Sequence, residues 1–149
     1  MKTIILVLST MLIGTKIFAQ QENAAIKEVL QNETTAFFKH DFSKSYSFWH
    51  ITPESLGVVS ESDGQVLYLT SKELNAEYTA KALRDAVFPD RVERSKWLLQ
   101  VRGNTAYVTF QQTAFKGNST TGQTYESRYM EKIDGHWKII SMTVVNFKK

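Results

Sequence analysis

The sequence contains no cysteine and only two prolines among its 149 residues. The absence of cysteine excludes disulfides, thiol nucleophiles and thiolate metal sites, and it predicts that the chain has no lipid anchor on an N-terminal cysteine. Basic residues form no run and no evident face, which argues against nucleic acid as a partner. A chain of this length suits one domain, and its stability must come from a packed core.

The longest apolar run lies at the start of the chain. Met1 and Lys2 form a short basic start, and eight of the ten residues 4–13 are apolar. This order, followed by Ala19 and a polar segment, is typical of a secretory signal peptide. The run is shorter than the roughly 20 residues that a bilayer span needs, so cleavage after Ala19 is favoured over an uncleaved anchor. We predict a signal peptide at 1–19, and a periplasmic or secreted protein with no membrane contact after cleavage.

Cleavage changes the charge of the protein. Lys2 and Lys16 leave with the signal peptide, so the 18 basic residues become 16, against 15 acidic residues. The mature domain, residues 20–149, is therefore nearly neutral, and the basic character of the precursor predicts nothing about its partners.

The first half of the mature chain has a helical period. Apolar residues recur at three- and four-residue spacing from Asn23 to His40, which predicts a helix. Asp41 is a good N-cap for a short second helix, and Leu56 to Ser60 is typical of a strand. Thr70 to Glu73 has the form of a capping box, which predicts a third helix running through Ala82.

The second half changes to a period of two. Four β-rich runs follow, separated by Gly103-Asn104, a loop at 117–122 and Asp134-Gly135: Val92 to Arg102, Thr105 to Phe115, Gln123 to Ile133 and Trp137 to Phe147. Asp-Gly between two such runs is a strong hairpin signal. Three helices followed by an antiparallel meander predict an α+β domain with helices on one face of a curved sheet.

Two segments carry a resemblance to a known family. The segment from Glu126 to Ile140, ESRYMEKIDGHWKII, resembles the closing hairpin of nuclear transport factor 2-like proteins, which has an acid-x-Arg followed by Asp-Gly-x-Trp. It is most similar to the association domain of calcium/calmodulin-dependent protein kinase II and to small SnoaL-like bacterial proteins. The segment from His40 to Tyr46 resembles the link between the first two helices of that family.

The resemblance implies a cone-shaped fold with a pocket at its open end, commonly in a homodimer formed through the sheet. It also implies that Arg128 lines the pocket, where it holds either a ligand carboxylate or the neighbouring Glu126. Aromatic side chains with hydroxyl or indole groups are candidates for the pocket wall, since small-molecule sites are mostly apolar with a few polar groups. The candidate ligand-binding residues are Arg128, Glu126, Tyr46, Trp49, Tyr107 and Thr143.

Evidence for catalysis in the sequence is weak. Enzymes of this superfamily place an aspartate or histidine on the later strands, where the alignment puts Ser141 and Thr143, and a second pocket arginine of the association domain aligns with Gln112. His50 and Glu54, near the expected mouth of the cone, are the remaining candidates for a general base. The histidines do not have the spacing of metal ligands, so we expect neither metal nor cofactor.

Three functions follow from these features. The first is an exported protein that binds a small organic molecule, such as a carboxylate, through Arg128 and aromatic walls. The second is an isomerase, cyclase or hydrolase that uses His50 or Glu54. The third is a homodimeric assembly module without a small-molecule ligand, because a common fold does not fix a function.

Overall fold

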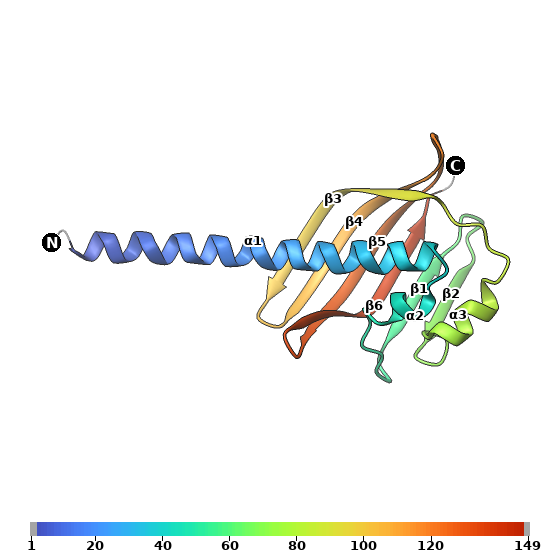
Figure 1. Cartoon of the computed structure of the whole chain (residues 1–149), viewed down its shortest axis with the longest axis horizontal. Coiled ribbons are helices and arrows are strands. Elements are labelled where there is room, and N and C mark those ends of the chain that lie inside the picture. Colours follow the sequence, from blue (N-terminus) through green and yellow to red (C-terminus); the bar gives the residue numbers. More distant parts are fainter. Residues whose placement is uncertain (1–2, 148–149) are drawn as a thin grey trace.

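The computed structural model describes residues 3–147, with side chains from residue 19 on. Its longest element is α1 (Thr3–Phe38), whose C-terminal half lies against a sheet while its N-terminal half extends beyond it (Figure 1). The helix covers much of the predicted signal peptide; residues 1–2, its basic start, lie outside the described residues. Cleavage after Ala19 stays a prediction. In the described part of the chain, no helix combines the length and the apolar character needed to cross a membrane.

The helices end and begin at identifiable signals. His40 has a positive φ of 60° just after α1, and Asp41 then caps α2 (Phe42–Tyr46) by accepting a hydrogen bond of 3.0 Å from the Lys44 N–H. The third helix begins later than its sequence predicted. It is α3 (Ala76–Ala82), capped by Asn75, because the Thr70–Glu73 hydrogen bonds close a turn before the helix instead of opening it.

The sheet has six strands in the order β2-β1-β6-β5-β4-β3. The strands are β1 (Leu56–Ser60), β2 (Val66–Thr70), β3 (Arg91–Arg102), β4 (Thr105–Lys116), β5 (Ser119–Ile133) and β6 (His136–Asn146). The predicted meander is β3 to β6, and all its neighbours are antiparallel. The sheet as a whole is mixed, because β1 pairs in parallel with β6 and carries β2 on its far edge. The sequence did not predict β2 as a strand.

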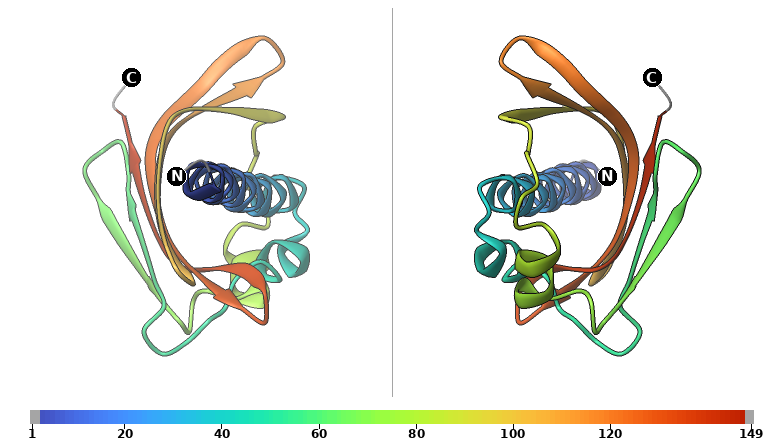
Figure 2. Two further views of the ribbon diagram at one scale, coloured as in Figure 1. Left: turned by 90° about the vertical axis from the view of Figure 1, so that its left-hand side faces the viewer. Right: turned by 90° about the vertical axis from the view of Figure 1, so that its right-hand side faces the viewer.

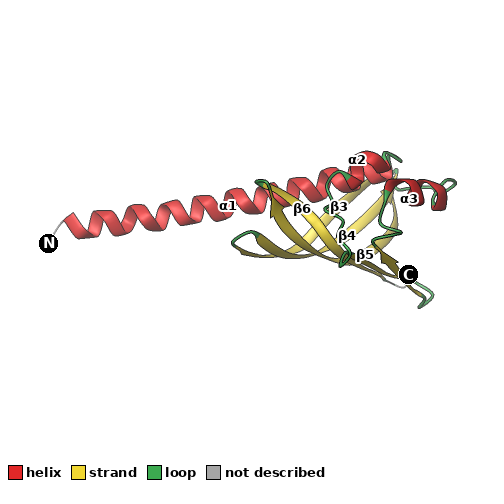
Figure 3. Cartoon of the chain, turned by 90° about the horizontal axis from the view of Figure 1, so that it is seen from below, coloured by secondary structure: helices red, strands yellow, loops and turns green. Residues whose placement is uncertain are grey.

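The sheet curves around the C-terminal half of α1 (Figure 2), and the helices lie on its concave side (Figure 3). Three bulges help it to bend, one between Ser95 and Leu98 on β3, one at Thr121 on β5 and one at Ile140 on β6. The β5–β6 hairpin turns at Asp134 and Gly135, both with positive φ, as the Asp-Gly signal predicted. A bulge places two residues opposite one, so inward and outward positions exchange beyond it.

The core fills the space between α1 and the concave face. Its fully buried members include Ile26 and Leu30 of α1, and Phe110, Met130 and Ile139 of the sheet. Packing of α1 against the sheet begins at Glu22. Lys132 donates to both carboxylate oxygens of Glu22 at 2.7 Å, and this contact lowers the pKa of that carboxyl.

Candidate functional site

A cavity of about 270 Å³ lies inside the cone, between the last turns of α1, α2 and the concave face of the sheet. Its walls divide into two chemical halves. The apolar half is made by Phe37, Phe38, Tyr46, Trp49, Val59, Met142 and Val144, and the polar half by Glu33, Thr34, Gln112, Thr124, Glu126 and Arg128. Such an amphiphilic lining is typical of a site for a small organic molecule with one polar end.

The polar half is centred on an ion pair within β5. Glu126 and Arg128 are two residues apart, so both side chains point to the concave face. Arg128 Nη2 donates to Glu126 Oε2 at 2.6 Å, and the two side chains are 5% and 4% exposed. Thr124 Oγ1 donates to the other oxygen of Glu126 at 2.7 Å. Each oxygen of the Glu126 carboxylate thus accepts one hydrogen bond from the protein.

A second buried carboxylate faces the cavity from α1. Glu33 Oε1 accepts from Ser45 Oγ at 3.2 Å and from Trp49 Nε1 at 3.3 Å, and Oε2 accepts from Thr34 Oγ1 at 3.0 Å. These neutral donors come from α1, α2 and the residues after α2, so Glu33 fixes the helices relative to one another. The three donors hold the carboxylate of Glu33 in one orientation at the edge of the cavity.

Arg94 on β3 contacts two residues of the polar half, Gln112 and Thr34. Its Nε donates to Gln112 Oε1 at 2.9 Å and its Nη2 donates to Thr34 Oγ1, so it connects β3 both to β4 and to α1. Burial is the main cause that lowers the pKa of Arg94, to about 10, which leaves it protonated at neutral pH. Two carboxyl side chains, Glu33 and Glu126, and two guanidinium side chains, Arg94 and Arg128, therefore share this region.

The two guanidinium groups lie over one aromatic ring. The Cζ atoms of Arg94 and Arg128 are 4.7 Å and 5.6 Å from the centroid of Phe110, which is fully buried. Two of their nitrogens, Arg94 Nη1 and Arg128 Nε, are buried without a hydrogen-bond partner among the described residues. An unpaired buried donor is costly, and in a native protein it calls for a partner such as water or a ligand acceptor.

The structure brings together four of the six predicted ligand-binding residues. Arg128, Glu126, Tyr46 and Trp49 all line the cavity. Burial raises the pKa of Tyr46, whose hydroxyl shares a hydrogen bond of 2.9 Å with Thr79 Oγ1. The aromatic wall on the helix side therefore has a hydroxyl that is already paired.

The other two predicted ligand-binding residues, Tyr107 and Thr143, do not line the cavity, because the strand register turns them away from it. Tyr107 is 46% exposed on the convex face of β4, because the inward positions of that strand are Val108 and Phe110. Thr143 pairs with Ser127 and does not line the cavity. The bulge at Ile140 reverses the alternation on β6, so Met142 and Val144 face inward where Ser141 and Thr143 were expected.

The two candidate bases are not in the cavity. His50 and Glu54 are exposed, and neither lines it. His50 instead contributes its backbone N–H to the Ile139 carbonyl at 2.9 Å, which ties the chain after α2 to β6. The geometry therefore gives neither residue the position that general-base catalysis on a bound molecule requires.

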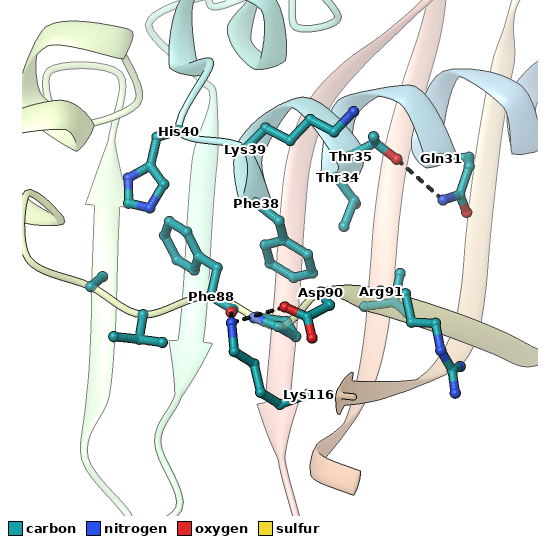
Figure 4. A pocket seen from close by; sticks show the side chains of 14 residues that line it. Gln31, Thr34, Thr35, Phe38, Lys39, His40, Phe88, Asp90, Arg91 and Lys116 are labelled. Atoms are coloured by element: carbon teal, nitrogen blue, oxygen red, sulfur yellow. Dashed lines mark hydrogen bonds and ion pairs between the residues drawn. The ribbon is translucent and has the colours of Figure 1, made fainter. Parts of the chain in front are cut away.

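A second hollow lies outside the cavity, at the end of α1. This groove, of about 590 Å³, shares Thr34 and Phe38 with the cavity. Figure 4 shows Phe38 and Phe88 next to one another in this groove, and their rings stack with centroids 5.6 Å apart. Lys116 is paired with Asp90 at 2.8 Å, and this bond lowers the pKa of Asp90. The groove and the cavity therefore share Thr34 and Phe38 as lining residues.

Sequence reasoning did not name Glu33, Thr34, Thr124 or Arg94 as residues of the site, and it gave Gln112 only as the residue that aligns with a pocket arginine. Glu33 stands at an inward position of α1 among apolar residues, and that was a signal for a buried polar role. Arg94 and Gln112 lie directly opposite one another on β3 and β4, but the bulge after Ser95 hides the alternation of β3 in the sequence.

Comparison with known proteins identifies the architecture. No protein-family model matches the sequence, and no curated protein matches it. Among solved structures, a nuclear transport factor 2-like protein of unknown function from Pseudomonas putida superposes with a TM-score of 0.67, at 12% identity over 85% of this chain and 87% of that one. This chain has the nuclear transport factor 2-like fold. The likeness shows the fold alone, because every identity is low.

Two further structures agree with this fold. A nuclear transport factor 2-like protein from Cytophaga hutchinsonii gives a TM-score of 0.62 at 16% identity, over 84% of this chain and 98% of that one. A protein of unknown function with a cystatin-like fold from Nostoc punctiforme gives 0.66 at 15% identity, over 83% and 90% of the two chains. The α+β cone predicted from the sequence is thereby confirmed.

Proposed function

We propose that this protein binds a small organic acid inside the cone, with the carboxylate against Arg128 and the apolar part against the aromatic wall. The observation that carries the proposal is the buried guanidinium of Arg128, which lines the polar half of an amphiphilic cavity. Nη2 donates to Glu126 at 2.6 Å and Nη1 donates to the Ser127 carbonyl at 2.9 Å, so the ligand carboxylate uses the remaining N–H groups of these two nitrogens. If the predicted signal peptide is cleaved, binding takes place in the periplasm or outside the cell.

The first test is native mass spectrometry and ligand titration with Arg128→Lys. Lysine keeps the positive charge beside Glu126, so the fold survives, but it lacks the planar fork of N–H donors that a guanidinium offers to a carboxylate. We expect the wild type to carry a ligand or to bind small carboxylates, and the variant to bind them about 30-fold more weakly.

Arg102→Lys is the matched control, since Arg102 is exposed at the end of β3. It should leave the affinity unchanged. Equal carboxylate affinity in the wild type and in Arg128→Lys would refute the role of Arg128. Catalysis has less support than binding, because His50 and Glu54 lie outside the cavity.

The convex face of the sheet supports a further proposal, a homodimer. Its central positions on β4 and β5 carry uncharged Tyr, Thr, Gln and Ser side chains, with Tyr107, Tyr125 and Tyr129 exposed. Tyrosine enrichment and depletion of charge are typical of the centre of an interface. A second copy suits this face, since two uncharged surfaces can pair about a twofold axis without charge complementarity.

The dimer is tested by placing a charge on this face. Tyr107→Arg puts one arginine on each copy, and like charges brought together in an interface are repulsive. We expect sedimentation equilibrium to show a dimer for the wild type and at least a tenfold weaker association for the variant. A wild type that is monomeric at millimolar concentration would contradict the proposal, and Lys72→Arg, at an exposed position in the turn after β2, serves as control.

A further inference from the structure

The amide of Gln112 is oriented by its neighbour on the next strand. Arg94 and Gln112 form a cross-strand pair, and the Arg94 Nε–H donates to Gln112 Oε1 at 2.9 Å. A guanidinium nitrogen can only donate, so the amide atom that faces it must be the oxygen. The choice between oxygen and nitrogen, which an isolated amide leaves open, is therefore made by Arg94.

The other end of the amide is then a free donor. Gln112 lines the cavity and is 8% exposed. Its Nε2 makes no hydrogen bond within the described residues, and it is not among the polar atoms sealed from solvent. A side chain buried to this degree with an accessible unpaired amide nitrogen needs an acceptor from the contents of the cavity.

Arg94 itself is held in place by contacts that do not depend on the ligand. Its Nη2 donates to Thr34 Oγ1, which in turn donates to Glu33 Oε2 at 3.0 Å, and its guanidinium rests on Phe110. The position of Arg94 is thus fixed from α1, β3 and β4 together. An orienting residue of this kind pre-organises the donor before a ligand arrives, which reduces the entropy cost of binding.

We infer that Gln112 is a second specificity-determining residue of the cavity, and that Arg94 is the positioning residue that makes it a hydrogen-bond donor. The inference rests on the proposed function and deepens it. The bound group must offer acceptors both to Gln112 Nε2 and to the guanidinium of Arg128, which a carboxylate does with its two oxygens. A cavity arranged in this way selects a carboxylate over an amine of the same shape, because an ammonium has no acceptor.

Gln112→Glu is the sharpest test, since glutamate has nearly the same shape. One of its oxygens can still meet Arg94, now as an ion pair, so the fold is kept, while the other oxygen replaces the donor by an acceptor. We would titrate phenylacetate, hexanoate and their primary amides by ligand-observed NMR. For both carboxylates the affinity should fall at least 30-fold in Gln112→Glu, whereas for the amides, which offer N–H donors, it should fall less than threefold.

A second variant tests the orienting role of Arg94 separately from the donor role of Gln112. Arg94→Met removes the orienting donor, so the amide can rotate and present its oxygen half of the time. Carboxylate affinity should fall by about tenfold, and the side-chain NH2 resonances of Gln112 in a nitrogen–proton correlation spectrum should move in the free protein. If Arg94 had a purely structural role, Arg94→Met would lower stability without changing the ratio of carboxylate to amide affinity.

The outcomes distinguish the two proposals. Carboxylate binding that is lost in Arg128→Lys but unchanged in Gln112→Glu would overturn this inference and leave the proposed function standing. A wild type that binds neither carboxylate, and whose Gln112 NH2 resonances do not move in acetate, would overturn both. Selective loss of the carboxylates in Gln112→Glu would support both.

Discussion

Replacing Arg128 with methionine should destabilise the protein by about 3–5 kcal/mol, the usual cost of removing one partner of a buried ion pair. Glu126 would remain 3% exposed with only Thr124 as a donor. The other buried arginine cannot easily take over, because Arg94 already bonds to Gln112 and Thr34. The loss of stability in Arg128→Met therefore reports the cost of leaving Glu126 buried without its cation. It does not report the net contribution of the ion pair to stability.

The loss of stability in Arg128→Met should depend on pH in a defined direction. A buried carboxylate without its cation has a pKa above that of the unfolded chain, about 4.3 for glutamate. The folded variant then binds more protons than the unfolded chain, so its stability falls as the pH rises above that value. The deficit of Arg128→Met should consequently be larger at pH 8 than at pH 5.

Two further variants identify the cause. Glu126→Gln combined with Arg128→Met removes both charges, and we expect it to recover most of the loss, ending within about 1–2 kcal/mol of the wild type. Arg91→Met breaks the exposed pair with Glu93, whose side chains are 47% and 67% exposed, and should change stability by less than about 0.5 kcal/mol. Urea unfolding followed by circular dichroism provides the measurement. A double variant as unstable as Arg128→Met would contradict this account.

Local signals in the sequence predict most of the elements because their causes are local. The positive φ values at Asp134 and Gly135 and the side-chain cap at Asp41 each involve residues within one turn. Burial of Trp137, 4% exposed, follows from the alternation around that hairpin. By contrast, β2 was missed, and its place at the edge depends on the pairing of β1 with β6, more than 80 residues away.

The alternation of inward and outward side chains along a strand predicts which residues face the cavity only up to the first bulge. On β5 the alternation is unbroken from Glu126 to Arg128, so both were placed correctly. On β6 the extra residue Ile140 reverses it, and Thr143 was placed on the wrong face. A bulge has no reliable local signature, since it satisfies the curvature of the whole sheet.

The buried polar network is the least predictable part of the site. Its hydrogen bonds join residues that lie far apart in the chain, such as Thr34 and Arg94, 60 residues apart, or Glu33 and Trp49, 16 apart. Sequence patterns can show that Glu33 occupies an inward position, but not which donors meet it. Partners of this kind are set by the packing of α1 on the sheet, which only the assembled fold determines.

Replacing Phe110 with alanine should destabilise the protein by about 3–5 kcal/mol, as large-to-small changes in a closed core do. Phe110 is fully buried, its ring lies 4.7 Å from that of Trp97, and it supports both guanidinium groups. The loss includes the cavity left by the ring and the cation–π contacts, each worth up to about 2 kcal/mol when desolvated.

Phe110→Leu separates these contributions, because leucine fills much of the space without offering an aromatic face. Phe42 is the matched position: it is 5% exposed and contacts the rings of Phe37 and Phe88, and no guanidinium lies over it among the described residues. If the ring stabilises the two arginines, Phe110→Leu should cost at least 1 kcal/mol more than Phe42→Leu in urea unfolding. It should also weaken carboxylate binding, since Arg94 and Arg128 lose their common support. Equal costs at the two positions, with unchanged binding, would mean that Phe110 only fills space and that hydrogen bonds alone hold the arginines.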